Sequence, residues 1–236
     1  MRDVSLQHFI GIAVMVLGAG LCVWGARMHW GRGMAVVTRG LALLIVAAWA
    51  GEYIADAVLG IWSLRYDLPL QLTDAVSVVS ALALWTERPR LVELCYLWAM
   101  TASLQAVLTP DLAYSFPSIF YFTYFIYHDG AIVGACLLVF GRRIHLRSGA
   151  LRRVYLTTLA WACVSGLGDV LTGGNYMFLR EKPEHSSLLS ALGSWPWYIL
   201  ITMVVLAPAL LALAAGVARL VQRWEGAAPP SMPSRL

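Results

Sequence analysis

Seven stretches of this 236-residue chain are apolar for long enough to cross a lipid bilayer. At about 1.5 Å per residue, a helix of about twenty residues spans a hydrocarbon core of about 30 Å. Lipid offers a peptide backbone no hydrogen-bond partners, so stretches of this length are expected to be helices rather than strands. The sequence therefore predicts an all-α, polytopic membrane protein with seven transmembrane helices, at residues 8–26, 35–60, 69–86, 91–109, 118–141, 151–174 and 195–220.

The composition agrees with this fold class and excludes a soluble globule. Only 13% of the residues are charged and 60% are hydrophobic, whereas soluble domains carry about one-quarter charged residues. We therefore expect one seven-helix domain over residues 1–225. The remaining residues, 226–236, contain three prolines and are expected to form a disordered cytoplasmic tail.

The distribution of basic residues predicts the orientation of the helices. If the chain crosses seven times, one side of the membrane holds Arg2, Arg65, Arg180 and Lys182, and the other side holds the remaining thirteen of the seventeen Lys and Arg residues. Cytoplasmic loops are the ones enriched in basic residues. The N-terminus is therefore expected outside and the C-terminus in the cytoplasm. Arginine strongly outnumbers lysine, which is typical of a high-GC genome and favours a bacterial inner membrane.

Several polar side chains fall inside the predicted helices, where each must face a cavity or a partner. Counting residues from the helix ends places most of them in the outer half of the membrane, which predicts a polar pocket that opens outward. Glu93 is the exception, and we expect it either to snorkel to the membrane surface or to pair with Arg88 or Arg90. The pocket set comprises Glu52, Asp56, Gln71, Thr73, Asp74, Gln105, His128, Asp129, Asp169 and Asn175.

Several common chemistries do not fit these residues. A retinal Schiff base needs a lysine in the last helix, but Lys182 is the only lysine and precedes that helix. A zinc site needs about three converging ligands, and no HxxxH or HExxH spacing occurs. We therefore expect no metal, no retinal and no other cofactor. The basic residues are explained by topology, so nucleic-acid binding is not expected either.

A hydroxyl nucleophile with a histidine base remains as a candidate catalytic pair. Threonine is inert at neutral pH until a base removes its proton, and a neutral imidazole within about 3 Å can do so. Thr73 is the candidate nucleophile, His128 the base, and Asp169 or Asp56 the carboxylate that orients the imidazole. The alternative for Thr73 is a structural hydrogen bond to the carbonyl of Pro69 one turn back.

The order of several short motifs resembles a known family. In this chain the motifs are Leu68-Pro-Leu-Gln-Leu-Thr-Asp74, Leu108-Thr-Pro-Asp-Leu112, Phe116-Pro117, His128, Asn175-Tyr-Met-Phe-Leu179 and Leu192-Gly-Ser-Trp-Pro-Trp-Tyr198. Together they resemble the YwaF-like bacterial integral membrane proteins, whose eukaryotic relative is the transmembrane-protein-164 acyltransferase. More distantly, the chain is similar to the androgen-induced threonine hydrolases, which cleave fatty-acid esters of hydroxy fatty acids.

This resemblance implies acyl chemistry on lipids. The eukaryotic relative is regarded as an acyltransferase acting on lysophospholipids with a cysteine nucleophile and a histidine partner. Matched by motif, the nucleophile position is Thr73 and the histidine is His128. Threonine at that position departs from the cysteine-bearing relatives and agrees with the threonine hydrolases.

The sequence thus favours a membrane-embedded lipid hydrolase or acyltransferase that acts on membrane lipids or an acyl-lipid substrate. The alternatives are a transporter or lipid-binding protein that uses the same pocket without covalent chemistry, or a structural subunit. The oligomeric state is open. Residues expected to contact substrate are Glu52, Asp56, Gln71, Gln105, Tyr124, Asn175 and Trp197.

The catalytic hypothesis makes one geometric demand. For straight, upright helices, Thr73 and His128 differ in depth by about 9 Å, which is too far for a hydrogen bond. We expect Pro69 to start its helix below the membrane surface, after a re-entrant segment at residues 64–68. The Thr73 hydroxyl and an imidazole nitrogen should then lie within about 4 Å, directly or through one bridging atom.

Overall fold

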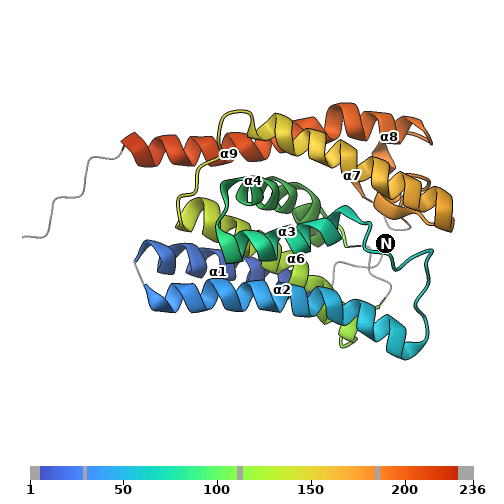
Figure 1. Ribbon diagram of the computed structural model, residues 1–236, viewed down its shortest axis with the longest axis horizontal. Coiled ribbons are helices and arrows are strands. Elements are labelled where there is room, and N and C mark those ends of the chain that lie inside the picture. The colour runs from blue at the N-terminus through green and yellow to red at the C-terminus, as the bar shows by residue number, and fades with distance from the viewer. Residues whose placement is uncertain (1–5, 29–30, 111–113, 184–186, 228–236) are drawn as a thin grey trace, which may run out of the picture.

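The computed structural model describes residues 6–28, 31–110, 114–183 and 187–227, and these residues contain helices and no strand. Seven helical rods run alongside one another (Figure 1). Three rods contain a π-helical turn. The rods are α1 (Leu6–Arg27), α2 (Arg32–Leu59), α3 (Leu72–Thr86), α4–η1–α5 (Pro89–Trp98, Ala99–Ser103, Leu104–Leu108), α6–η2 (Ile119–Cys136, Leu137–Gly141), α7 (Ala150–Thr172) and α8–η5–α9 (Trp197–Ile201, Thr202–Leu206, Ala207–Ala227). Two 3-10 turns, η3 (Tyr176–Phe178) and η4 (Leu188–Ala191), lie in the connection after α7.

Each predicted window contains a helix, and six of the rods in the described part are long and apolar enough to cross a membrane. The exception is α3, which has 15 residues. It was predicted to start at residue 69, but it begins at Leu72, because Gln71 is extended and its backbone N–H donates to Oδ2 of Asp74 at 2.8 Å. This capping contact, three residues after Gln71, fixes the start of the helix. The all-helical membrane fold is confirmed, while the seventh crossing and the orientation stay predictions.

The rods give the bundle two ends. The long-loop end carries the connections after α2, α5 and α7, and the short-loop end carries those after α1, α3 and η2. The helix α9 extends to Ala227 at the short-loop end, past the predicted end at residue 220. Residues 226 and 227, predicted as the start of the disordered tail, are therefore helical, and residues 228–236 lie outside the described residues.

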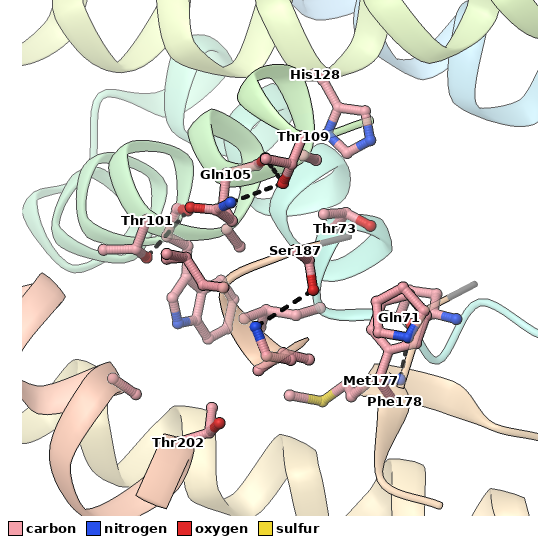
Figure 2. A pocket seen from close by; sticks show the side chains of 18 of the residues that line it. Gln71, Thr73, Thr101, Gln105, Thr109, His128, Met177, Phe178, Ser187 and Thr202 are labelled. Carbon is pink, nitrogen blue, oxygen red and sulfur yellow. Dashed lines mark hydrogen bonds between the residues drawn. The ribbon is translucent and has the colours of Figure 1, made fainter. Parts of the chain in front are cut away.

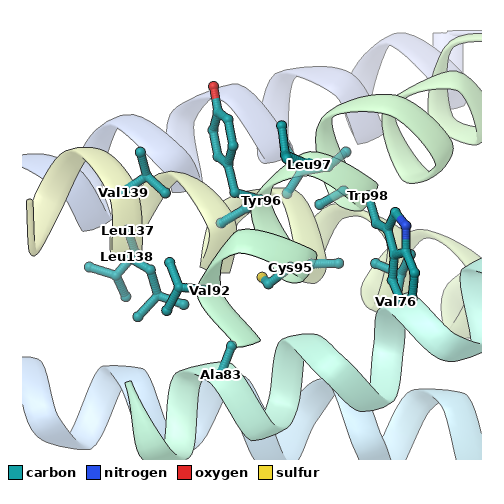
Figure 3. Close-up of a cluster of buried hydrophobic side chains, with 14 of the residues drawn as sticks. Val76, Ala83, Val92, Cys95, Tyr96, Leu97, Trp98, Leu137, Leu138 and Val139 are labelled. Carbon is teal, nitrogen blue, oxygen red and sulfur yellow. The ribbon is translucent and has the colours of Figure 1, made fainter. Parts of the chain in front are cut away.

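The core is built around α6, which packs against α1, α2, α3 and α4. In Figure 1, α1 and α2 lie along one side of the molecule and α7 and α9 along the other. Figure 3 shows the cluster toward the short-loop end, where side chains of α4 meet those of η2 and α3. Its fully buried members include Val92, Tyr96, Leu97, Leu137 and Leu138.

A buried carboxylate joins the α6–α7 connection to α4. The Glu93 side chain is only 2% exposed, and it accepts hydrogen bonds from Arg147 at 2.7 Å and from Arg153 at 2.9 Å. The hydrogen bond from Arg147 to Glu93 raises the pKa of Arg147. The predicted pairing of Glu93 with Arg88 or Arg90 is wrong, because the chain folds two arginines from beyond α6 onto the carboxylate.

Candidate functional site

A cavity of about 560 Å³ lies between α2, α3, α5, α6, α7 and α9. Residues of the connection after α7, including Met177, Phe178 and Leu188, complete its wall. The volume is in the range typical of small-molecule sites. Most of its lining side chains are apolar or aromatic, and the polar ones come from several helices.

Ten residues were predicted to act in catalysis or to contact the substrate, and seven of them line this one cavity. They come from α2, α3, α5 and α6, so the fold gathers side chains that are far apart in the sequence. Those seven are Glu52, Asp56, Gln71, Thr73, Gln105, Tyr124 and His128.

Thr73 is the second residue of α3, and its side chain faces the cavity (Figure 2). The alternative structural bond to Pro69 does not form: the Thr73 hydroxyl makes no hydrogen bond to any described residue, whereas the Thr73 carbonyl accepts one from Ser77. In the first turn of a helix, backbone N–H groups have no partner within the helix. The backbone N–H of Thr73 donates to no described residue. A free hydroxyl and a free N–H donor therefore meet at one residue.

Asp74 anchors this turn to α2. One carboxylate oxygen accepts hydrogen bonds from Trp49 Nε1 at 3.0 Å and from the Tyr53 hydroxyl at 2.8 Å. The other oxygen accepts the Gln71 N–H. The sequence identified Asp74 as a polar residue at membrane depth but assigned it no function. The structure shows that it fixes the backbone on the C-terminal side of Thr73.

The irregular segment before α3 is held by α7 and the connection after it. The Ser165 hydroxyl donates to the Leu70 carbonyl at 2.7 Å. The Tyr176 hydroxyl donates to the Leu64 carbonyl at 2.7 Å and accepts from the Leu68 N–H at 3.0 Å. The segment at residues 64–68 is non-helical, as predicted. Leu64 and Tyr66 are 56% and 65% exposed, so the expected burial of this segment in protein is wrong.

Gln71 joins the same segment to the cavity wall. Its side-chain Oε1 accepts the backbone N–H of Met177 at 2.7 Å. Met177 and Phe178 both have φ of 55°, a left-handed conformation that is unfavourable for residues other than glycine. Tyr198 donates to the Phe178 carbonyl at 2.6 Å. Partners on α8 and before α3 therefore hold this strained turn against the cavity.

His128 lies in the middle of α6 and is only 2% exposed. Its ring packs against Tyr124 and Tyr127, with centroid separations of 4.4 Å to each. Nδ1 is buried and has no hydrogen-bond partner in the described part of the chain. Figure 2 shows His128 and Thr73 toward the same side of the cavity. A distance within about 4 Å between the hydroxyl and the imidazole stays a prediction.

The structure does not bring Asp169, Asn175 and Trp197 to the cavity. Asp169 accepts the Tyr176 N–H at 2.6 Å and so closes the end of α7. The Asn175 side chain accepts the N–H groups of Arg180 and Glu181 and stabilises the loop. Trp197 is 62% exposed. Among the described residues, no carboxylate bonds to His128 as an orienting group.

The sequence missed several polar residues that line the cavity. Two of them gave a usable signal, because Thr101 and Thr109 lie four residues before and after Gln105, a spacing that places all three on one helical face. Asp67 and Tyr127 join the carboxylates and aromatic rings already named. The missed polar set comprises Asp67, Thr101, Thr109, Tyr127, Thr158, Ser187 and Thr202.

Metal chemistry receives no support from the described residues, in which no group of three or more His, Cys, Asp or Glu side chains is placed to hold a metal ion.

Comparison with known proteins identifies the family of this chain. No curated protein and no solved structure matches the chain. The sequence model of the TMEM164 family matches residues 4–214, which is most of the chain and includes every residue that lines the cavity. The protein is therefore an integral membrane protein that belongs to the TMEM164 family.

Proposed function

We propose that this protein is a membrane-embedded lipid hydrolase or acyltransferase in which Thr73 is transiently acylated and His128 transfers the proton. One observation carries the proposal. A threonine hydroxyl and a buried histidine Nδ1, neither with a hydrogen-bond partner among the described residues, line the same largely apolar cavity. Buried polar groups normally have partners, so the histidine without one, beside an accessible hydroxyl, favours a functional role.

The proposed reaction has two steps. His128 accepts the Thr73 proton while the hydroxyl oxygen attacks the carbonyl carbon of a lipid ester, and the departing alcohol then takes that proton. The acyl group is left as an ester of Thr73. In the second step, water or a second lipid hydroxyl gives its proton to His128 and attacks the carbonyl carbon of the acyl-threonine. The bond to the Thr73 oxygen breaks, and His128 returns the proton to that oxygen.

The first turn of α3 supplies a donor for the oxyanion that forms in both steps. The free backbone N–H of Thr73 belongs to the residue that attacks, so it lies beside the developing negative charge. The positive end of the helix dipole adds to this stabilisation. Asp74 holds the turn in place through Trp49 and Tyr53, so the donor is fixed before the substrate arrives.

An acyl-directed probe tests the proposal. The purified protein, incubated with an alkyl fluorophosphonate, should gain one adduct that peptide mass spectrometry places on Thr73. Thr73→Ala should abolish the adduct, and His128→Ala should slow its formation by about 10²- to 10⁴-fold. Ser77→Ala, a matched hydroxyl deletion one turn along α3, should label normally. Equal labelling of wild type and both site variants would instead favour lipid binding or transport without covalent chemistry.

The setting of this activity is part of the proposal. The high arginine content supports a bacterial inner membrane, with the long-loop end facing outward. The cavity carries Glu52, Asp56 and Asp67 near that end. These carboxylates would be the residues to neutralise if the protein were found to transport a solute.

A further inference from the structure

The cavity continues as a slot away from the candidate catalytic pair. One wall is a face of the α4–η1–α5 rod, with Trp98, Thr101, Ala102 and Gln105. The opposite wall is a face of η5–α9, with Met203, Leu206, Ala207, Leu210 and Leu211. Both sets recur every three or four residues, as one helical face requires. The slot therefore runs along the helix axes.

The slot leads from the long-loop end toward the middle of the bundle. Trp98 lies ten residues before the last residue of α5, which is about 15 Å along the rod. Figure 2 shows Thr101 and Thr202 toward one side of the cavity and Thr73 and His128 toward the other. The slot walls therefore extend to one side of the candidate catalytic pair.

A tryptophan and a threonine close the deep end of the slot. Trp98 Nε1 donates to the Thr158 hydroxyl at 2.8 Å, and that hydroxyl donates to the Val154 carbonyl at 2.9 Å. Trp98 is 3% exposed, and Leu211 on the opposite wall is equally buried. The contact between Trp98 and Thr158 joins α4 to α7 at this end of the slot.

The walls present few free polar groups. The Thr101 hydroxyl donates to the Leu97 carbonyl of its own helix, and the Tyr155 hydroxyl occupies the Met203 carbonyl in the π-helical turn. Thr202 is the exception, since its hydroxyl is buried without a partner in the described residues. A narrow slot with such walls favours an extended hydrocarbon chain over a polar ligand.

We infer that this slot holds a single acyl chain of the lipid substrate and that Trp98 sets the longest chain accepted. The inference rests on the proposed function, because it places the ester next to Thr73 and His128. The cavity of about 560 Å³ is within the size range of sites that bind a single small molecule, so it has room for one acyl chain.

Chain-length profiles of two opposite variants test the inference. The full-length protein in nanodiscs would be reacted with alkyl fluorophosphonates of increasing chain length, and the labelling rate of each would be measured. Trp98→Leu should move the preferred length up by about two methylene groups, since the volume removed is about twice 30 Å³. Ala207→Phe, which fills the slot halfway, should move it down. Trp85→Leu removes an exposed indole on α3 and should keep the wild-type profile.

Binding measured without catalysis separates this inference from the proposed function. In a Thr73→Ala background, native mass spectrometry would record which fatty acids of graded length stay bound to each variant. Shifted binding profiles with no labelling of wild type would keep the acyl slot and reject the threonine chemistry. Labelling at Thr73 with one unchanged length profile in both slot variants would reject the slot and keep the chemistry. If Trp98→Leu does not fold, Trp98→Phe, which removes less of the same side chain, takes its place.

Discussion

Glu93, near the short-loop end, and His128, in the cavity that opens at the long-loop end, are both only 2% exposed. The Glu93 carboxylate accepts hydrogen bonds from two arginines, whereas Nδ1 of His128 has no partner among the described residues. In a low-dielectric interior, a polar group without a partner is costly. The comparison teaches that satisfied polar groups here hold helices together. Two of the buried atoms without a partner among the described residues, His128 Nδ1 and the Thr202 hydroxyl, belong to residues that line the cavity.

The two ends of the bundle are predicted to face opposite sides of the membrane, and a reporter at each end gives a yes-or-no answer. A reporter that is active only outside the cytoplasm should be active when inserted near Arg180, at the long-loop end, and silent when fused after Arg235. The reason is the excess of basic residues in the loops of the short-loop end. The opposite pair of readings would invert the membrane position of the cavity and leave the helical fold unchanged.

Thr73→Val should have the largest effect on activity. It removes a hydroxyl that makes no hydrogen bond in the described structure and keeps the side-chain shape. We therefore expect ester turnover to fall by about 10³-fold or more, with little change in melting temperature. Thr86→Val, which alters an exposed threonine at the other end of α3, is the matched control. Retained turnover in Thr73→Val would exclude threonine as the nucleophile.

Removing both partners of Glu93 should have the largest effect on stability. The double variant Arg147→Ala, Arg153→Ala leaves a buried carboxylate without a counter-charge, which is strongly destabilising, so the melting temperature should fall. Thermal unfolding in detergent would measure it. Arg88→Ala with Arg90→Ala removes the same charge near the same end without touching Glu93. If both double variants melted alike, net charge rather than the buried pair would explain the stability.

The outcome for Glu93 shows what the sequence could and could not predict. Hydropathy located every rod, because apolar length is a property of each segment alone. The pairing predicted for Glu93 was with Arg88 or Arg90, its neighbours along the chain. Its partners in the structure, Arg147 and Arg153, come from beyond α6. The role of Asp74 was missed for the same reason, since Trp49 and Tyr53 reach it from another helix. Tertiary partners of a buried polar residue are not encoded in its local sequence.

The site was predictable to a similar degree. Seven of ten proposed residues line one cavity, because polar residues at membrane depth have few places to go. Asp169 was expected beside His128, but the chain turns after α7 and presents the Tyr176 N–H to its carboxylate. The connection after α7 is irregular, so no periodic pattern in the sequence predicts which backbone group meets this carboxylate.

The smallest predicted effect concerns Thr158, a hydroxyl in the cavity wall that is satisfied. Thr158→Val removes the acceptor of Trp98 Nε1 and leaves that donor buried, which should cost about 1–3 kcal/mol. The melting temperature should fall while Thr73 still labels. Thr157→Val, next to it on the exposed face of α7, should melt like wild type. A stable Thr158→Val would mean that the indole N–H finds another partner.

The shortness of α3 has a consequence for the surrounding membrane. Fifteen residues cover about 22 Å, whereas the hydrocarbon layer is about 30 Å thick. The segment before Leu72 is irregular backbone fastened to α7 by hydrogen bonds, and it cannot extend the helix. If α3 crosses the membrane as predicted, local thinning of the bilayer would relieve this mismatch. Under the proposed function, headgroups would then reach the first turn of α3, and an ester could meet Thr73 without leaving its leaflet.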